Sequence, residues 1–579
     1  MKFRLKLPID RTLLIVLVVA FVLRFAGAWY GLPSLYNSDE PFNVVNALAY
    51  GAKKSLEPTY FVYPALYSYF LLGVYGLYFV AGTLTGSFGN ALDFGAAYFI
   101  NPGGLFLTGR ILSVLLGVAA IFLVFRIAQR FFSQRVAYLA AALLALSTTH
   151  TNLSHWILPE AAVAFMSALA LYAVFRFHEL PTFKSVLMAG VACGLAISTK
   201  YNAGFVMLSL LLSIFLHFRR EPSRLVKFGG GGLLAVLAGF LIGSPYWLLS
   251  FSSYMHDLKY TVAHVDAGMV GHISSLPILW PLWEMIYSDW TVGLLLVTGF
   301  FYAFTQPEKK QYLLLAFVLP TLVVMGFWDR TGVHYLAPVL PALAILAAVF
   351  FDKIVSLKMS TSLRIALVAV ALLPSLVKIA YQDIRLTQED TRTAAKAWIE
   401  SHIRRESMIA YENYVYGPNL FDPARFLKNA SESRLLPLEI KERLLEESRR
   451  RTSYRLVNLR KDFRLRALSE LDVSEKSGDN AYVRQLLETR LPKLSSVRKA
   501  GVPYLMISSD NYARYFRGAP PAQGTAVWLS YQNGRRFYQS VLKSDDLILL
   551  QEFNATFWSL GPTIKIYKFK KDDEGGNRE

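Results

Sequence analysis

The first long apolar stretch of the chain, residues 12–29, reads TLLIVLVVAFVLRFAGAW. A membrane-spanning helix needs about 20 predominantly apolar residues, and this stretch has the length and composition to form one. The basic segment MKFRLKLPIDR precedes it and no small-residue cleavage site follows it, so we interpret it as a retained anchor rather than a removed signal peptide. The Lys and Arg residues before it predict a cytoplasmic N-terminus.

Ten further apolar stretches follow, at residues 110–125, 135–149, 159–177, 184–199, 203–218, 226–247, 288–305, 311–327, 334–351 and 363–380. With 54% hydrophobic residues, 17% charged residues and a mean hydropathy of +0.35, they exclude a soluble cytosolic protein. The only cysteine, Cys193, excludes an intrachain disulfide. Because so much of the chain is apolar, we read the formal charge of +19 as a guide to membrane orientation and expect no nucleic-acid partner.

The distribution of Lys and Arg decides how one more apolar stretch, residues 65–82, is placed. If it crosses the membrane, the basic loop 126–135 lies outside, against the positive-inside rule. If it lies in the interface plane, all the basic loops fall on the cytoplasmic side, where they carry 18 Lys and Arg against 5 Asp and Glu. We therefore predict about 11–12 transmembrane helices within residues 1–380, with 65–82 as a juxtamembrane or re-entrant helix of a first outer loop, 30–109.

Residues 381–579 have mixed charge and no long apolar run, which predicts a soluble domain on the extracytoplasmic side. Residues 391–403 are predicted to form an amphipathic helix, and 434–468 a charged helix with a basic stripe. Short strands are predicted at 407–412, 504–509, 547–552 and 563–569. The expected fold class is a polytopic α-helical protein of the plasma (inner) membrane with a C-terminal extracytoplasmic α/β domain.

Nearly all unusual polar residues fall on the outer side in this topology. The first outer loop contains the adjacent carboxylates Asp39 and Glu40, and the outer ends of later spans contribute Arg110, Glu160, Lys200, Arg330 and His334. Charges at membrane depth are costly and need a partner or a cavity. Because several separate helices bring such residues to one level, we expect a shared site.

Each of these residues also has a simpler interpretation. Asp39 and Glu40 could form a solvated loop pair, Lys200 could snorkel to the interface, and Arg110 and Arg330 could be interface anchors. Arg24, inside the first span, either snorkels or pairs with an outer carboxylate. We favour interfacial polar roles over metal ligation for His150 and His155, because a spacing of five residues suits helical ligands poorly.

Taken together, the constellation suits an anionic lipid carrier whose tail lies in the bilayer and whose phosphate lies at the outer interface. A carboxylate beside an apolar wall can accept a proton from a hydroxyl group. Lys and Arg can stabilise the negative charge that develops on a departing phosphate.

Several segments resemble a known family in the same order along the chain. They are NSDEPFNVVNALAYG followed by YPALYSYFLL, then GRILSVLLG, LSHWILPEAAVAF, GLAISTKYNAG, GSPYWLL and HYLAPVLPALAIL. Over about residues 10–350 the sequence resembles the dolichyl-phosphate-mannose protein mannosyltransferase superfamily, which is glycosyltransferase family 39 and its relatives, including the aminoarabinose lipid A transferases. These are type-C membrane glycosyltransferases.

The resemblance implies an inverting enzyme that takes a sugar from a polyprenyl-phosphate donor on the extracytoplasmic face and moves it to an acceptor hydroxyl. It implies Asp39 as the general base, with Glu40 at the adjacent acidic position and Arg110 near the acidic pair or the donor phosphate. Lys200, followed by Tyr201, and His334, with Arg330 nearby, match basic positions that face the phosphate, and Glu160 stands where relatives often have aspartate.

The chain also departs from the family pattern. Many relatives have His or Lys before Pro-Pro, whereas this chain has Tyr63, Pro64 and Ala65, so a donor contact carried over to Tyr63 lacks the cation. Residues 381–579 match no sugar-binding module, so transfer to protein Ser or Thr is not implied. The sugar, the acceptor (protein, lipid or glycan), the oligomeric state and a requirement for a divalent cation stay open.

Two alternatives to an enzyme remain at this stage. A polytopic transporter or flippase of a lipid-linked anionic substrate would suit the many spans, although the charges gather at one face and no inverted repeat is visible. A non-catalytic scaffold would use the outer domain, with its basic stretch 441–468, to bind a partner or an anionic surface.

Overall fold

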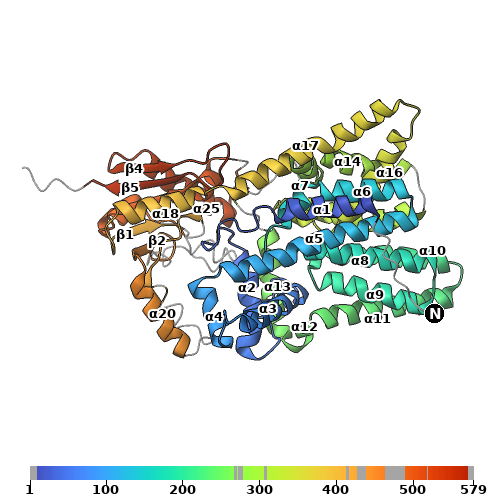
Figure 1. Cartoon of the computed structure of the whole chain (residues 1–579), viewed down its shortest axis with the longest axis horizontal. Coiled ribbons are helices and arrows are strands. Elements are labelled where there is room, and N and C mark those ends of the chain that lie inside the picture. The colour runs from blue at the N-terminus through green and yellow to red at the C-terminus, as the bar shows by residue number, and fades with distance from the viewer. Residues whose placement is uncertain are drawn as a thin grey trace, which may run out of the picture.

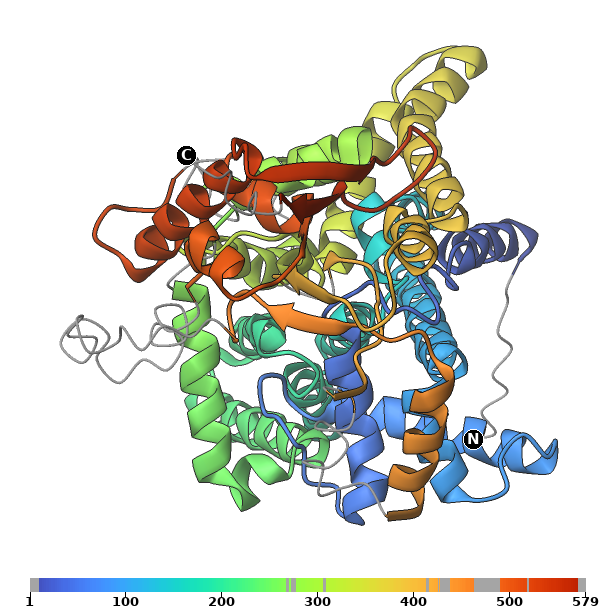
Figure 2. The same ribbon diagram turned by 90° about the vertical axis from the view of Figure 1, so that its left-hand side faces the viewer.

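The computed structural model describes residues 10–266, 270–271, 278–305, 309–412, 416–424, 426, 438–462, 490–517 and 520–570. Its helices form a long bundle, and an α/β domain lies against one end of that bundle (Figure 1). Seen from that end, the strands of the domain lie in front of bundle helices that are viewed along their axes (Figure 2). This arrangement confirms the predicted polytopic α-helical fold with a C-terminal α/β domain (Figure 1), and the side of the membrane on which that domain lies stays a prediction.

Every apolar stretch of the sequence forms a helix of the bundle. The helices are α1 (Arg11–Phe25), α5 (Gly103–Phe131), α6 (Gln134–Ala145), α8 (Pro159–Glu179), α9 (Phe183–Ile197), α10 (Val206–Phe218), α11 (Pro222–Gly243), α14 (Trp280–Thr305), α15 (Lys309–Gly326), α16 (Leu340–Val355) and α17 (Thr361–Thr387). Helix α5 packs against α1, α6 and α8, and α16 packs against α6 and α14. The main apolar core lies between these helices.

The helices at the expected spans differ in length. Within the described part of the chain, eight helices are long and apolar enough to cross a membrane. The expected spans at α1, α6, α9 and α16 have only 15, 12, 15 and 16 helical residues. Helices α6 and α16 are largely buried against neighbouring helices, so they pass through protein rather than lipid along much of their length.

Small residues bring α9 and α11 into close contact. A Cβ atom at Gly194 would lie 2.1 Å from the Val236 carbonyl oxygen, and one at Gly239 would lie 2.3 Å from the Val191 carbonyl oxygen. Without a hydrophobic driving force between helices in lipid, such close backbone packing is a main source of helix association.

Further helices gather at the end of the bundle that faces the α/β domain (Figure 1). They include α2 (Glu40–Lys53), α3 (Leu66–Leu84), α4 (Ala91–Ile100), α12 (Tyr246–Leu249) and α13 (Phe251–Asp266), which lie together in Figure 1. Helix α3 contains the stretch 65–82 and is long and apolar enough to cross a membrane. It packs against α2 and α5, and its assignment to the interface plane stays a prediction.

The C-terminal domain is built on a five-stranded mixed sheet in the order β2-β1-β3-β5-β4. Its strands are β1 (Met408–Tyr411), β2 (Arg455–Asn458), β3 (Tyr504–Ser508), β4 (Leu547–Phe553) and β5 (Ile564–Phe569). Strand β1 pairs in parallel with β2 and β3, whereas β5 pairs antiparallel with β3 and β4. Helices α18 (Thr391–His402), α20 (Leu438–Arg450), α23 (Leu494–Lys499) and α25 (Ala526–Leu542) complete the domain.

The four predicted strands and the helix at 391–403 are confirmed within a residue or two, but the charged helix at 434–468 is wrong over part of its length. Helix α20 ends at Arg450, and Arg455–Asn458 is strand β2. The rest of that segment, from residue 463, lies outside the described residues. The bundle also extends beyond the expected boundary at residue 380, because α17 ends at Thr387.

Candidate functional site

The acidic pair of the first outer loop divides into one exposed and one buried carboxylate. Asp39 is exposed at the N-terminal end of α2, where its side chain accepts a hydrogen bond from the Ser38 hydroxyl (3.0 Å) and makes no helix-capping contact. Glu40 is fully buried and forms a two-pronged ion pair with Arg110, with N–O distances of 2.8 and 2.7 Å. The solvated-pair interpretation therefore fits Asp39 alone.

Arg110 is occupied by contacts within the protein. Besides Glu40, its Nη1 donates to the carbonyl oxygens of Ala28 and Tyr30, both at 2.8 Å, and its guanidinium lies 5.0 Å from the ring centre of Trp156. The side chain is fully buried. Of the two positions expected for Arg110, the structure has the one beside the acidic pair, and its contacts with carbonyl oxygens hold the turn before α2.

Helix α2 also holds the loop that leads into α8 (Pro159–Glu179). The Ile157 amide donates to Glu40 Oε1 at 3.0 Å, and Asn43 Nδ2 donates to the Ile157 carbonyl oxygen at 2.9 Å. Glu160 stands three residues further on, in the first turn of α8. These two bonds therefore fix the position of Glu160 relative to the helix that begins beside Asp39.

Glu160 and Lys200 form a second buried ion pair. Lys200 Nζ donates to Glu160 Oε1 at 2.7 Å, and the two side chains are only 7% and 3% exposed. The ammonium group lies 5.7 Å from the ring centre of Tyr63 and 5.6 Å from that of Tyr335. Lys200 therefore does not snorkel. Glu160 Oε2 is buried and has no hydrogen-bond donor among the described residues, which leaves one oxygen to accept a bond from a ligand.

Tyr63 lies at the centre of these charges. Burial raises the pKa of its phenol, the nearby carboxylates of Glu160 and Asp39 raise it further, and Arg330 opposes the shift. A tyrosine phenol is protonated at neutral pH even at its ordinary pKa, so this hydroxyl can act as a hydrogen-bond donor. A neutral phenol thus stands where the family pattern has a cation.

The remaining predicted residues surround this centre. Arg330 is partly exposed, and its amide donates to the Val265 carbonyl oxygen at 3.3 Å. His334, in η2 (Val333–Leu336), stacks on Tyr335 with ring centres 4.1 Å apart. Tyr201, in η1 (Tyr201–Phe205), donates to the Phe61 carbonyl oxygen at 3.3 Å, so it supports the segment that carries Tyr63.

Sequence reasoning missed Tyr335, Asn43 and Asn202. Asn202 Nδ2 donates to the Tyr335 carbonyl oxygen at 3.0 Å and so joins η1 to η2. Asn43 stands one helical turn after Asp39 and Glu40, which was an available signal for a side chain on the same helix face. Nothing in the sequence pattern separates Tyr335 or Asn202 from other polar residues near span ends.

A second buried polar cluster joins the end of α1 to the end of α17. Arg24 Nη2 contacts His150 Nδ1 at 2.8 Å, and His155 Nε2 lies 3.5 Å from Asp383 Oδ1. All four side chains are buried, and Arg24 interacts electrostatically with Asp383. Arg24 instead contacts His150 and donates to backbone carbonyl oxygens, and Asp383 of α17 acts on it only electrostatically, so the expected pairing with an outer carboxylate is not seen among the described residues.

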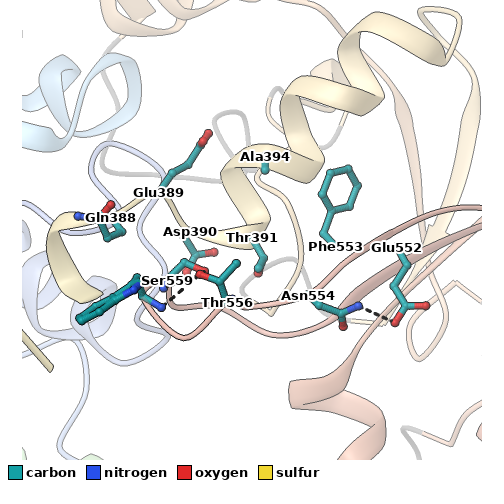
Figure 3. A pocket seen from close by; sticks show the side chains of 11 residues that line it. Gln388, Glu389, Asp390, Thr391, Ala394, Glu552, Phe553, Asn554, Thr556 and Ser559 are labelled. Carbon is teal, nitrogen blue, oxygen red and sulfur yellow. Dashed lines mark hydrogen bonds between the residues drawn. The ribbon is translucent and has the colours of Figure 1, made fainter. Parts of the chain in front are cut away.

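The structure also contains a cavity of about 450 Å³ at the junction of α17 and the C-terminal domain (Figure 3). Its lining consists of Gln388, Glu389, Asp390, Thr391, Ala394, Glu552, Phe553, Asn554, Thr556, Trp558 and Ser559. These residues include three carboxylates and neither Lys nor Arg, so the cavity is unsuited to a phosphate. The donor headgroup is better matched by the Lys200 region.

The described residues contain no group of three or more His, Cys, Asp and Glu side chains placed to hold a metal ion. Comparisons with known proteins give one match to a family model, which is described as dolichyl-phosphate-mannose-protein mannosyltransferase and covers residues 101–248. No curated protein sequence matches the chain.

Solved structures that are similar to this chain share little sequence identity with it. ArnT from Cupriavidus metallidurans bound to undecaprenyl phosphate has a TM-score of 0.47 at 14% identity, over 96% of this chain and 97% of that chain. The oligosaccharyltransferase AglB from Archaeoglobus fulgidus, in complex with an inhibitory peptide and a dolichol-phosphate, has a TM-score of 0.47 at 13% identity, over 90% and 71%. The Pmt1-Pmt2 complex of S. cerevisiae has a TM-score of 0.30 at 21% identity, over 47% and 36%.

The matched region supplies Arg110, Glu160 and Lys200 and includes the bundle helices that position them. The predicted resemblance to the dolichyl-phosphate-mannose-protein mannosyltransferase family is thereby confirmed for residues 101–248.

Proposed function

We propose that the chain is an inverting glycosyltransferase that moves a sugar from a polyprenyl-phosphate donor to an acceptor hydroxyl at the extracytoplasmic face. The observation that carries this proposal is the site around Tyr63, where an exposed carboxylate and a buried Lys–Glu pair lie at one end of an apolar helix bundle. The match of residues 101–248 to the mannosyltransferase family supports the same chemistry.

Asp39 is the residue best placed to act as the base. Its carboxylate is exposed and free of ion pairs among the described residues, whereas Glu40 is committed to Arg110. In the reaction, the acceptor O–H gives its proton to Asp39 while its oxygen bonds to the anomeric carbon. The bond from that carbon to the phosphate oxygen breaks, and the phosphate leaves with the bonding electrons.

Lys200, Arg330 and His334 surround the proposed position of the departing phosphate. Lys200 carries its positive charge in a buried setting where electrostatic interactions are strong, and Arg330 interacts with Tyr63 and Tyr335. The Tyr63 hydroxyl would donate a hydrogen bond to a phosphate or sugar oxygen. We assign Glu40 and Arg110 to positioning Asp39, and Glu160 to orienting Lys200 and accepting a bond from the sugar.

The proposal also assigns the chain an orientation in the membrane and gives its two parts separate roles. Residues 1–380 would form the membrane-embedded transferase, with a cytoplasmic N-terminus, and residues 381–579 would form an extracytoplasmic domain above it. The sugar and the acceptor are not specified by the site. A flippase would need ionisable groups along a transmembrane path, whereas Asp39 and Glu160 stand at the N-terminal ends of α2 and α8, and Lys200 follows the end of α9.

The decisive test is transfer from radiolabelled polyprenyl-phosphate hexoses and pentoses in membranes that contain Asp39→Asn, Asp39→Glu or the unaltered chain. We expect Asp39→Asn to lose transfer by at least about a hundredfold, as is usual for removal of a general base, and Asp39→Glu to retain part of the activity. Ser38→Ala is the matched control, because it removes only the hydroxyl that bonds Asp39. Full activity in Asp39→Asn would refute the base assignment.

A further inference from the structure

The loop between β4 (Leu547–Phe553) and β5 (Ile564–Phe569) exposes two large aromatic side chains. Phe557 is 67% exposed and Trp558 is 54% exposed. The loop is nevertheless well ordered by its own bonds, since the Thr556 amide donates to Ser559 Oγ at 2.8 Å and the Ser559 amide donates to Thr556 Oγ1 at 3.1 Å. A rigid turn therefore presents two apolar rings outward.

The same loop is fixed to helix α17 (Thr361–Thr387). The Tyr381 hydroxyl donates to the Phe557 carbonyl oxygen at 2.6 Å, and Arg385 donates twice to the Ser559 carbonyl oxygen, at 3.0 and 2.8 Å. The Tyr381 ring lies 4.8 Å from the ring centre of Phe557 and 6.0 Å from that of Trp558. Residues 381–385 therefore fix the position of the loop along the axis of α17.

The exposed apolar side chains of α17 indicate which part of this helix lies in the bilayer, and so where the loop lies relative to it. Its long apolar side chains are exposed along one side. Only 17% of its most apolar 18-residue stretch is buried. These exposed side chains are Leu363, Ile365, Val370, Leu373, Val377 and Ile384. At a rise of about 1.5 Å per residue, Tyr381 lies about 26 Å from Arg364 along the axis, close to the thickness of about 30 Å of a hydrocarbon core. With Arg364 at one boundary of the hydrocarbon core, Tyr381 lies at the opposite boundary, which is the outer one in the orientation proposed above.

We infer that the 556–559 loop inserts Phe557 and Trp558 into the outer membrane interface and so fixes the C-terminal domain to the bilayer surface. Trp and Tyr favour this zone because their rings are apolar and their polar tips remain hydrated. The apolar surface of the loop continues the lipid-facing side of α17. Phe557 and Trp558 therefore contact lipid. An additional protein partner is the alternative that the experiment separates.

Spin labels measure this directly, because the chain has only one cysteine, Cys193, and it is buried. In a Cys193→Ser background, full-length protein in lipid nanodiscs is labelled at Phe557→Cys, at Val377→Cys as the lipid-facing reference, or at Asp545→Cys as the solvent-facing reference. We expect the label at 557 to collide with oxygen rather than with a water-soluble nickel chelate, as at 377. Accessibility to the chelate equal to that at 545 would overturn the inference.

Tryptophan fluorescence gives a second measurement that keeps Cys193. Brominated lipids quench rings that lie in the bilayer, so we expect Trp558→Phe to lose a quenched component of the emission. If the quenched fraction is the same in both proteins, Trp558 does not contact lipid, and the inference is overturned.

A separate observation concerns the start of α18 (Thr391–His402), where Asp390 and Arg392 are 3% and 5% exposed. Arg392 pairs with Asp390 at 2.8 Å, and both reach back to the first outer loop. The Tyr30 hydroxyl donates to Asp390, and Arg392 Nη1 donates to the Tyr36 carbonyl oxygen at 3.2 Å. The Arg392 guanidinium also lies 3.9 Å from the ring centre of Tyr36.

These contacts act on the segment that carries the proposed base. Tyr36 stands three residues before Asp39, and the carbonyl oxygen of Tyr30 accepts a hydrogen bond from Arg110. Residues 26–39 form turns and irregular structure rather than helix or strand, so their course depends on such side-chain contacts. Arg110 holds this segment from the bundle, and Arg392 holds it from the C-terminal domain.

On the basis of the proposed function, we propose that Arg392 and Asp390 are positioning residues that set the place of Asp39 at the site. A displacement of a base by about 1 Å can lower the rate a hundredfold without altering the binding of the other substrate. Loss of this contact should therefore lower kcat and leave the KM for the lipid donor nearly unchanged.

The test compares Arg392→Gln with Arg385→Gln, which removes an arginine from the same junction that bonds Ser559 rather than the first loop. We expect kcat to fall at least about tenfold in Arg392→Gln, to be partly restored in Arg392→Lys, and to stay near the original value in Arg385→Gln. Equal activity of Arg392→Gln and Arg385→Gln would overturn the proposal.

Hydrogen exchange provides a readout that does not depend on transfer. Amides of residues 31–39 should exchange faster in Arg392→Gln than in the unaltered chain, and Arg385→Gln should leave them unchanged. If no protein transfers sugar but this difference is seen, the proposed function fails and the structural coupling stands. Unchanged exchange in Arg392→Gln would refute the coupling itself.

Discussion

Lys200 Nζ lies 2.7 Å from Glu160 Oε1, and both side chains are almost completely buried. This pair joins the N-terminal end of α8 to the end of α9, and two tyrosine rings flank the ammonium group. A buried pair of this kind gives little net stability, but removing one partner leaves an uncompensated charge. Its presence at the proposed site is therefore better explained by a need for charge than by a need for stability.

We expect Lys200→Met to destabilise the protein by about 3–5 kcal/mol, because Glu160 would be left buried without its partner. The double variant Lys200→Met/Glu160→Gln should recover most of that stability while remaining impaired in donor binding. Thermal unfolding in detergent and the KM for a labelled polyprenyl-phosphate sugar measure the two effects. Normal donor binding in the stable double variant would show that Lys200 does not hold the phosphate.

Tyr63→Phe removes the proposed hydrogen-bond donor and keeps the ring. Because a tyrosine phenol is protonated at neutral pH, the loss of its hydroxyl should remove one bond to the donor and lower kcat/KM about tenfold to a hundredfold, as for bonds to charged groups. Tyr69→Phe is the control, since the Tyr69 hydroxyl bonds the Leu56 carbonyl oxygen at 2.9 Å, outside the site. Equal effects of the two variants would argue against a role for Tyr63 in donor contact.

Arg110→Lys should behave differently from the Lys200 variants. Lysine cannot reproduce the two-pronged pair with Glu40 together with the bonds to Ala28 and Tyr30, so the turn before α2 loses its support. We expect a lower unfolding temperature and a lower kcat, with little change in donor KM. A selective rise in donor KM would place Arg110 at the phosphate instead.

The contact between α9 and α11 gives a prediction about the scaffold. Gly194→Val should destabilise the protein by about 1–3 kcal/mol, because the added atoms meet the α11 backbone at Val236 and Phe240. Gly230→Ala in α11 is the control, since a Cβ there meets no atom within 4 Å. Thermal unfolding of both variants in detergent distinguishes a specific packing effect from a general intolerance of glycine replacement.

The sequence predicted the helices of the bundle well because lipid imposes a strong compositional signal on them. Four expected spans, α1, α6, α9 and α16, form helices of 12 to 16 residues, and α6 and α16 are largely buried against neighbouring helices, which composition alone does not reveal. The strand Arg455–Asn458 was missed because it has four residues and follows a charged helix without a clear break in pattern. Its pairing with β1 is a long-range contact that local periodicity cannot reveal.

The candidate site could be predicted only as a set of residues and not as a geometry. From the sequence, Arg110 suited a phosphate and the acidic pair equally well. Its position beside the acidic pair depends on hydrogen bonds to the carbonyl oxygens of Ala28 and Tyr30, and no side-chain pattern encodes these bonds. The buried state of Glu40 beside an exposed Asp39 likewise follows from how α2 packs on the 154–158 loop.

Two contacts join residues that are synthesised at very different times. One is between Tyr30 and Asp390, and the other is between Tyr36 and Arg392. The stretch that bears Asp39 is made early, yet the partners that secure it emerge only after the last bundle helix, α17, has been synthesised. During biosynthesis, the nascent protein would therefore pass through membrane insertion with its acidic loop unsecured. Competence for catalysis would arise late, once translation has delivered the start of α18.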